Sequence, residues 1–293
     1  MRILHLDAGK EMRGGQWQAL RLIEGLAAAG IESTLLARDG APLFTEARKG
    51  GWRVEPLGLM RAVKHARGHD LIHAHDARTH TMGVIVRGAP LLVARRVAFP
   101  IGTGQIASKW KYARARHYIA VSEFVKNVLI EGGVPASIIS VVYDGVPVIE
   151  RNAAAEEIIA LRKGAALAAE AAALANVPIA LSDDLEQDLR RAAMLVYITH
   201  AEGLGSGALL AMSAGVPVIA SNLGGLPEIV RHRETGLLVD NDPAAIAAAI
   251  RELLDHPDLA RSLAAEARRT VLERFTVEHM VRHTMEVYRQ VLA

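Results

Sequence analysis

The residues best suited to chemistry lie in one stretch, between His200 and Val230. Glu202 opens a glycine-rich turn, and an apolar helical run follows it. The turn continues through Gly203, Leu204, Gly205 and Ser206. Glycines before a helix let a ligand approach the backbone closely, and the free N–H groups at a helix start favour an anion. Glu202 is therefore a candidate to contact a polar ligand, although an acidic residue in this place can also be an ordinary helix cap.

A second glycine turn, Gly224-Gly225, follows an apolar run at 216–220. The run is short and bounded by turn residues, which indicates a buried strand. Two glycine turns around one buried strand predict a ligand-facing edge of an α/β sheet.

Three further candidates lie in the amino-terminal half. Gly14-Gly15 follows the first expected strand and opens a helix, His75 ends the fourth strand, and Arg95-Arg96 ends the fifth. Adjacent residues on a strand point to opposite faces, so at most one of the two arginines faces a ligand at this edge. The alternatives are an ordinary turn for the glycines and a solvated strand end for the arginines.

His73 and His75 point to the same side of their expected strand, which raises the question of a metal ion. One strand supplies only two ligands, which is fewer than a zinc site needs. We therefore predict no metal site and expect His75 to make a polar contact with substrate at the strand end. A structural hydrogen bond is the alternative.

The elements that position these residues alternate regularly between short apolar runs and helical ones. The expected strands cover residues 3–7, 31–37, 52–57, 70–75, 90–97, 118–122 and 138–144, followed by 177–181, 195–199, 216–220 and 236–239. Nearly continuous apolar strands between helices predict an α/β fold with parallel sheets covered on both faces.

An Ala-rich stretch at 149–176 separates the two sets of strands and has the composition of a helix. We therefore expect a domain at 1–148, a connecting helix at 149–176, and a second domain at 177–293. The second sheet has few strands, so we expect the connecting helix to cover its exposed part.

Composition excludes several classes of protein. The 293 residues hold 34 Lys and Arg against 32 Asp and Glu, so the charge balance does not argue for a nucleic-acid partner. Cysteine is absent, which leaves no disulfide framework or thiolate metal site. The chain shows neither a signal peptide nor an apolar run of about 18 residues. These features predict a cytoplasmic protein.

The most basic and aromatic stretch lies near residue 112. It contains Lys109, Trp110, Lys111, Tyr112, Arg114 and Arg116. Basic residues mixed with aromatic ones on one helix suit an anionic membrane surface, which would place the protein peripherally on the inner membrane face. An amphipathic surface helix is the alternative. A single helix without an accompanying motif does not predict nucleic-acid binding.

Taken together, several segments resemble the retaining GT-B glycosyltransferases of family 4. In the carboxy-terminal half they are EGLGSGALLAMSAGVPVIAS, NLGGLPEIV, ETGLLVDNDP and ERFTVEHMVRHTMEVYRQVL. In the amino-terminal half they are RGGQWQALRLIEGLAAAGIE, DLIHAHD, YIAVSEFVKNVL and ISVVYDGV. The resemblance covers nearly the whole chain.

The resemblance implies two Rossmann-like domains that face a cleft, with a last helix that packs back on the first domain. It implies sugar transfer with retention from a UDP- or GDP-linked donor, without a metal or other cofactor, as in cell-envelope polysaccharide or glycolipid synthesis. Glu202 would then lie at the donor sugar, and the backbone of Gly203 to Ser206 would line the sugar and diphosphate. Gly14, Gly15 and one of the arginines would lie near phosphate, and His75 at the cleft.

Two departures from the family pattern bear on activity. The second glutamate of the family motif, eight positions after Glu202, is Leu210 here. The Arg/Lys pair that neutralises the diphosphate has no clear counterpart, because Arg162-Lys163-Gly164 falls inside the expected helix; we therefore expect a truncated second domain. A missing clamp of this kind is typically worth about 10²–10³ in rate.

Two other functions stay open at this point. A non-catalytic relative that binds a sugar nucleotide or a partner protein would explain Leu210. A nicotinamide-dependent enzyme is disfavoured, because the first turn lacks G-x-G-x-x-G and no acidic residue ends the second strand.

Overall fold

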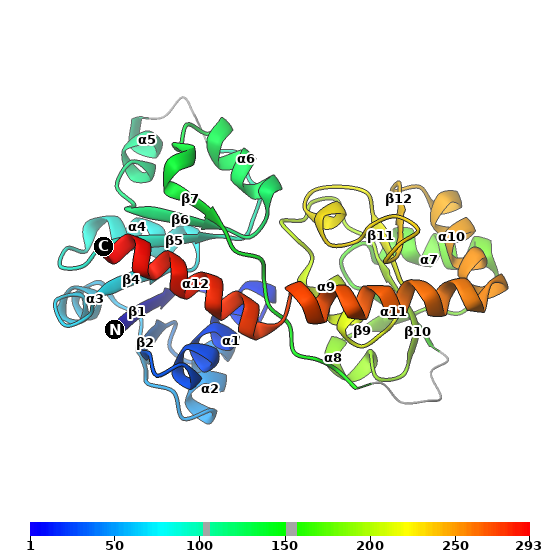
Figure 1. Ribbon diagram of the computed structural model, residues 1–293, viewed down its shortest axis with the longest axis horizontal. Coiled ribbons are helices and arrows are strands. Elements are labelled where there is room, and N and C mark those ends of the chain that lie inside the picture. The colour runs from blue at the N-terminus through cyan, green and yellow to red at the C-terminus, as the bar shows by residue number, and fades with distance from the viewer. Residues whose placement is uncertain (102–105, 151–156) are drawn as a thin grey trace. The chain divides into compact units, whose positions relative to one another are not determined.

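The computed structural model describes residues 1–101, 106–150 and 157–293, which form two compact units (Figure 1). The first unit consists of Met1–Gly145 and Val277–Ala293, and the second consists of Val146–Thr276. Each unit is built on its own parallel sheet, so the predicted α/β class is confirmed.

The first unit holds a seven-stranded parallel sheet in the order β3-β2-β1-β4-β5-β6-β7. The strands are β1 (Arg2–Asp7), β2 (Glu32–Ala37), β3 (Val54–Pro56), β4 (Leu71–Ala74), β5 (Leu91–Arg95), β6 (His117–Ala120) and β7 (Ile139–Val141). This order is Rossmann-like, and its direction reverses between β1 and β4. The carboxyl ends of β1 and β4 therefore flank the place where ligands bind in such sheets.

Helices cover both faces of this sheet. They are α1 (Gly14–Ala28), α2 (Pro42–Lys49), α3 (Leu59–Ala66), α4 (Ala77–Ile85), α5 (Ile106–Tyr112), α6 (Glu123–Glu131), the 3₁₀ turn η1 (Ala136–Ile138) and α12 (Val277–Leu292). Asp76 and Ser122 begin α4 and α6, because their side chains accept backbone N–H groups of the first turn. The last helix, α12, packs against α1, where Gly25 lets Val281 approach closely.

The second unit holds a five-stranded parallel sheet in the order β12-β11-β10-β8-β9. The strands are β8 (Glu157–Leu161), β9 (Ala180–Ser182), β10 (Ala192–Tyr197), β11 (Val218–Ser221) and β12 (Leu237–Val239). The helices are α7 (Ala165–Ala175), α8 (Leu185–Asp188), α9 (Ser206–Ser213), the 3₁₀ turn η2 (Leu226–Glu228), α10 (Pro243–Asp255) and α11 (Pro257–Arg274).

The prediction of one connecting helix over 149–176 is wrong. Residues 157–161 form β8, which pairs with β10 on one side and β9 on the other. The strand carries Ile158 and Ile159, which are 6% and 1% exposed, and β-branched side chains of this kind pack well in a buried sheet. Gly164, with φ +82°, then separates the strand from α7. Part of the predicted helix, 151–156, lies outside the described residues.

The helical part of that stretch covers the second sheet, as expected of it. Ala168 and Ala171 on α7 pack in one apolar cluster with Ile158, Met194 and Ile250. Small side chains let α7 lie close to the sheet and to α10. The second unit therefore gains a complete β-α unit, β8-α7, at the place where the sequence had suggested missing structure.

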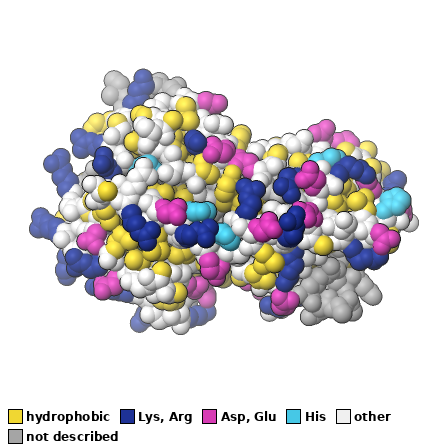
Figure 2. Space-filling view, viewed as in Figure 1, with side chains coloured by type: hydrophobic (Ala, Val, Ile, Leu, Met, Phe, Trp, Pro, Cys, Tyr) yellow, Lys and Arg dark blue, Asp and Glu magenta, His cyan; other side chains and the backbone are white. Residues whose placement is uncertain are grey.

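Charged side chains of both signs are interspersed on the face of the molecule in Figure 2, in keeping with the near-neutral composition. Among the described residues, no helix combines the length and the apolar character needed to cross a membrane.

Candidate functional site

In the second unit, the carboxylate of Glu202 is the centre of a polar cluster at the carboxyl ends of β8 and β10. Its Oε2 accepts hydrogen bonds from the Tyr197 hydroxyl at 2.8 Å and from Lys163 Nζ at 3.2 Å. Its Oε1 accepts from the Gly203 N–H at 3.1 Å. The side chain is 18% exposed, so the carboxylate is held in one orientation yet remains within reach of a ligand.

Lys163 is placed here by the strand that the sequence prediction missed. It lies two residues after the end of β8, is 52% exposed, and also donates to the Ala201 carbonyl at 2.6 Å. The interpretation of Arg162-Lys163-Gly164 as part of a helical run is therefore wrong. Arg162 instead pairs with Asp183, away from Glu202. The lysine thus supplies a cation at the strand ends, beside the carboxylate.

The two predicted glycine turns are pressed together in the same place. A Cβ on Gly224 would lie 2.2 Å from the Glu202 carbonyl oxygen, and one on Gly225 would lie 2.1 Å from that of Gly203. Gly205 has φ +108° and leads into α9. Only glycine fits these positions, so the backbone around Glu202 is built from two turns that no side chain separates.

The remaining predicted residues of this turn play different parts. Leu204 is only 2% exposed, so its side chain belongs to the core and only its backbone lies on the turn. Ser206 is the first residue of α9 and is half-buried. Leu210, one turn further along α9, is 8% exposed and lies in the apolar interior.

In the first unit, Arg96 lies against the glycine turn that begins α1. A Cβ on Gly15 would lie 3.7 Å from Arg96 Cδ, and Gly14 precedes it at the exposed start of the helix. Arg96 Nε donates to Asp144 Oδ1 at 3.3 Å, and the arginine side chain is 15% exposed. A half-buried cation and a helix start therefore lie side by side, which favours binding of an anion.

The two arginines diverge, as strand geometry requires. Arg95 donates to the Tyr112 hydroxyl at 3.2 Å and to the Phe99 carbonyl at 2.5 Å. It thus holds the loop after β5 rather than joining Arg96 at the glycine turn. Of the predicted pair, only Arg96 lies at the candidate site.

His75 is 6% exposed and both of its ring nitrogens face polar partners. Its Nε2 lies 3.0 Å from His5 Nδ1, and its Nδ1 lies 3.4 Å from an Arg96 guanidinium nitrogen. Burial, followed by the charges of His73, His5 and Arg96, holds the pKa of His75 well below the usual value. His75 is therefore a neutral hydrogen-bonding group and does not carry a positive charge near pH 7.

The sequence prediction missed His5, which brings a third histidine to this place. Ring nitrogens of His5, His73 and His75 lie within 4.8 Å of one another. The third candidate ligand comes from the neighbouring strand, a source that reasoning about one strand overlooked. These nitrogens lie close enough together to hold a metal ion, although a metal on His75 Nε2 would leave the hydrogen of that ring on Nδ1, 3.4 Å from an Arg96 nitrogen that donates. The absence of a metal from this cluster therefore stays a prediction.

Asp7 was also missed, although an acidic residue at the end of a buried strand is a recognisable signal. It is 1% exposed and accepts from the Gly9 N–H at 2.7 Å and from Gln16 Nε2 at 3.2 Å. Burial raises the pKa of Asp7 above its usual value. The carboxylate fixes the loop that leads from β1 to Gly14.

The basic aromatic stretch divides between surface and interior. Lys111 donates to the Ala77 carbonyl at 2.8 Å, and Tyr112 stacks on Tyr118. Trp110 is 48% exposed, and the Arg114 guanidinium lies over its ring at 4.4 Å. The exposed part of the predicted membrane-binding stretch is Lys109, Trp110, Arg114 and Arg116.

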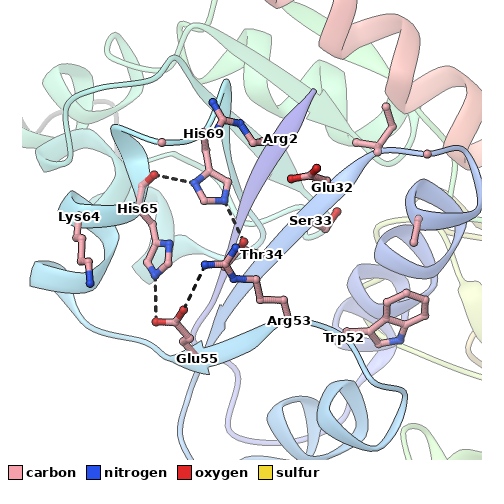
Figure 3. Close-up of a pocket in the computed structure, with 14 residues that line it drawn as sticks. Arg2, Glu32, Ser33, Thr34, Trp52, Arg53, Glu55, Lys64, His65 and His69 are labelled. Carbon is pink, nitrogen blue, oxygen red and sulfur yellow. Dashed lines mark hydrogen bonds and ion pairs between the residues drawn. The ribbon is translucent and has the colours of Figure 1, made fainter.

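A separate cavity of about 800 Å³ opens at the amino ends of the first sheet's strands (Figure 3). His69 contacts the His65 carbonyl and the Thr34 hydroxyl there, and Glu55 pairs with both His65 and Arg53. None of the predicted site residues lines this cavity. It lies at the opposite end of the sheet from Gly15 and Arg96.

Two family models match this chain, one in each unit. Residues 12–149 match the model described as Glycosyltransferase Family 4, and residues 162–270 match that described as Glycosyl transferases group 1. The second match begins at Arg162, so it includes Lys163 and the whole Glu202 turn.

Curated relatives match over part of their length. Alpha-maltose-1-phosphate synthase of Mycolicibacterium smegmatis is 35% identical over 116 residues, which cover 37% of this chain and 30% of the relative. D-inositol 3-phosphate glycosyltransferase of Rhodococcus opacus is 35% identical over 156 residues, which cover 53% and 34%. The match thus spans about a third of the length of these relatives.

Solved structures match over the whole length. HepE of Anabaena, in complex with UDP and glucose, has a TM-score of 0.88 at 18% identity and 99% coverage of both chains. Sucrose-phosphate synthase of Thermosynechococcus elongatus has a TM-score of 0.76 at 20% identity, covering 99% of this chain and 98% of its own. At these identities the likeness establishes the fold, which is GT-B-like and has one Rossmann-like parallel sheet in each unit.

Proposed function

We propose that this chain, which has the GT-B fold and matches glycosyltransferase models in both units, transfers a sugar from a nucleotide-sugar donor to an acceptor hydroxyl with retention. The donor would be UDP- or GDP-linked, and no metal or other cofactor takes part. The observation that carries the proposal is the contact of Lys163 with Glu202 beside two interlocked glycine turns.

Lys163 would supply a cation for the diphosphate, for which the sequence showed no clear counterpart of the family's Arg/Lys pair. The leaving diphosphate gains negative charge as the bond to the sugar breaks, and a fixed cation stabilises that charge. The N–H groups at the start of α9 add to this stabilisation. That HepE has been solved with UDP and glucose supports a nucleotide-sugar donor for a chain of the same fold.

Retention follows from attack on the face that the leaving group vacates. The acceptor oxygen forms a bond to the anomeric carbon while the bond to the diphosphate oxygen breaks. The hydroxyl proton passes to the departing phosphate oxygen, so no protein base is required. Glu202, held by Tyr197 and Lys163, would accept hydrogen bonds from donor-sugar hydroxyls and fix the sugar for this step.

Arg96 and the start of α1 would bind an anionic part of the substrate in the first unit. The test compares Arg96→Met with Arg95→Met in a transfer assay with UDP- and GDP-sugars. We expect Arg96→Met to lower kcat/KM by about 10²–10³, as for loss of one electrostatic donor. Arg95→Met should have a much smaller effect, because Arg95 binds Phe99 and Tyr112 instead. Equal losses would contradict the assignment.

Leu210 favours a second candidate function, a non-catalytic relative that binds a sugar nucleotide or a partner protein. At 8% exposure in the apolar interior, Leu210 offers no carboxylate to a ribose. The transfer assay with UDP- and GDP-sugars distinguishes the two functions. Saturable nucleotide binding without transfer from any donor would favour the second function, and transfer would exclude it.

The acceptor class that we propose is a cell-envelope polysaccharide or glycolipid, reached from the inner membrane face. Lys109, Trp110, Arg114 and Arg116 are exposed and combine charge with an aromatic ring, which suits an anionic lipid surface. Sedimentation with anionic vesicles tests this, with Trp110→Ala as the weakened variant. Equal sedimentation with neutral vesicles would contradict it.

A further inference from the structure

Four polar side chains form a chain of close contacts in the first unit. Ser33 Oγ lies 3.3 Å from His5 Nε2, and His5 Nδ1 lies 3.0 Å from His75 Nε2. His75 Nδ1 lies 3.4 Å from Arg96. The side chains come from β2, β1, the end of β4 and the end of β5, so the contacts cross the sheet where its strand order reverses.

The direction of each hydrogen bond from Arg96 to Ser33 follows from one residue. The Arg96 guanidinium can only donate. His75 Nδ1 must therefore accept, which places the hydrogen of the neutral ring on Nε2. That N–H donates to His5 Nδ1, and the hydrogen of His5 then lies on Nε2 and donates to Ser33.

We propose that His5 is a positioning residue that holds His75 as its Nε2–H tautomer, so that the Nδ1 lone pair orients the Arg96 guanidinium. The effect of these hydrogen bonds on catalysis rests on the proposed function. Asp144 fixes the other side of the guanidinium through Nε at 3.3 Å. Arg96 is thus held from two sides beside the glycine turn.

The proposal requires both histidines to stay neutral. His5 is fully buried, and burial lowers its pKa to about 3, with the charge of His69 adding to the effect. Burial is also the main reason that the pKa of His75 is lowered. A protonated His75 would present an N–H to Arg96 and repel it, so burial protects the orientation of the arginine near pH 7.

His73 offers a matched control within the same cluster. It lies beside His5 in the sheet register, is 1% exposed, and its ring lies 4.2 Å from that of His75. Its Nδ1 contacts the Tyr288 hydroxyl at 2.8 Å, and its Nε2 has no hydrogen-bond partner among the described residues. His73 therefore shares the burial and packing of His5 but takes no part in the chain to Arg96.

The decisive measurement is the position of the ring hydrogens in ¹⁵N-histidine-labelled protein. Two-bond ¹H–¹⁵N correlation spectra distinguish protonated from unprotonated ring nitrogens. We expect both His5 and His75 to carry hydrogen on Nε2 and a bare Nδ1. A hydrogen on Nδ1 of His75 would overturn the proposal. Displacement of all three histidine signals by stoichiometric Zn²⁺ would also overturn it, because His75 would then be a metal ligand.

Variants test whether His5 causes the tautomer. We expect His5→Phe to remove the fixed Nε2–H form of His75, so that its spectrum no longer shows one tautomer, and to lower kcat/KM by about 10- to 100-fold, the range for loss of a hydrogen bond to a charged group. His73→Phe should leave the pattern intact. His5→Gln should restore it, because its amide can accept from His75 and donate to Ser33.

The two hypotheses fail separately. Wild-type protein without transferase activity would contradict the proposed function, while the spectra would still decide the role of His5. Equal spectra and equal rates in His5→Phe and His73→Phe would contradict the positioning role, even in an active enzyme. Thermal unfolding of each variant shows whether a lost rate reflects a lost fold.

Discussion

Replacing Lys163 with methionine separates binding of a diphosphate from stability of the fold. Lys163 is 52% exposed and pairs with Glu202 at 3.2 Å. Exposed ion pairs contribute about 0–1 kcal/mol to stability, so Lys163→Met should unfold at nearly the wild-type temperature. Methionine keeps most of the apolar stem of the lysine, so the main loss is the charge.

The effect on nucleotide binding should be larger. Two unit charges 4 Å apart interact by about 1 kcal/mol in water and about 4 kcal/mol near a protein surface. A half-exposed lysine beside a diphosphate lies between these limits. The dissociation constant of the nucleotide should therefore rise by about 5-fold to 10³-fold.

Calorimetric titration with UDP and GDP measures this change. Lys126→Met is the matched control, because Lys126 also pairs with a glutamate, Glu123 at 2.9 Å, but lies on α6 of the first unit. The difference between the variants should shrink with added salt, since salt screens exposed charges. Equal affinity of Lys163→Met and wild type for the nucleotide would refute the role of Lys163.

Three further predictions concern other parts of the two units. Glu202→Gln keeps the shape of the side chain but removes its charge, and should lower initial transfer rates by about 10²–10³; an unchanged rate would exclude Glu202 from the reaction. Gly225→Ala should destabilise the second unit by about 1–3 kcal/mol in urea, because its Cβ would lie 2.1 Å from the Gly203 carbonyl oxygen; unaltered stability would show that the turns separate easily. Burial lowers the pKa of both His5 and His80 from 6.5 to about 3, so below pH 6.5 the unfolded chain takes up protons that the folded chain does not. Stability should then fall by about 1.4 kcal/mol per histidine for each pH unit down to pH 3, and equal urea midpoints at pH 7.5 and 5 would contradict this.

Regular features of the fold could be predicted from the sequence because they are local. Most strands of the first sheet hold a short apolar run between turn residues, and the turns at Gly14-Gly15, Gly203 to Gly205 and Gly224-Gly225 are marked by their glycines. The structure places these turns where the strand pattern suggested, at strand ends. The reason is that glycine requirements and apolar runs are fixed by neighbouring residues.

The strand at 157–161 could not be recognised in the same way. Alanines surround it on both sides and favour a helix, whereas the strand forms by pairing with β9 and β10, which follow later in the sequence. Lys163 was missed for the same reason. A residue predicted to lie inside a helix could not be recognised as one at a strand end. Tertiary pairing decided the structure here over local propensity.

The role of His5 was hidden for a related reason. His5 and His75 are 70 positions apart and meet only because β1 and β4 are neighbours in the sheet. Sequence reasoning found His75 from its place at a strand end, but it gave no means of choosing which strand lies beside it. The partner of a site residue is therefore harder to predict than the residue itself.

The most direct test of the proposed function is thermal unfolding of the purified chain with UDP, GDP, ADP and their common sugar conjugates. A nucleotide at about 100 times its dissociation constant stabilises the fold by about 2.7 kcal/mol, which raises the midpoint by about 5–11 °C. The proposal predicts such a shift with one base, uracil or guanine, and a smaller shift at the same nucleotide concentration in Lys163→Met. A well-folded protein that shifts with none of them would contradict a donor site at Glu202 and Lys163.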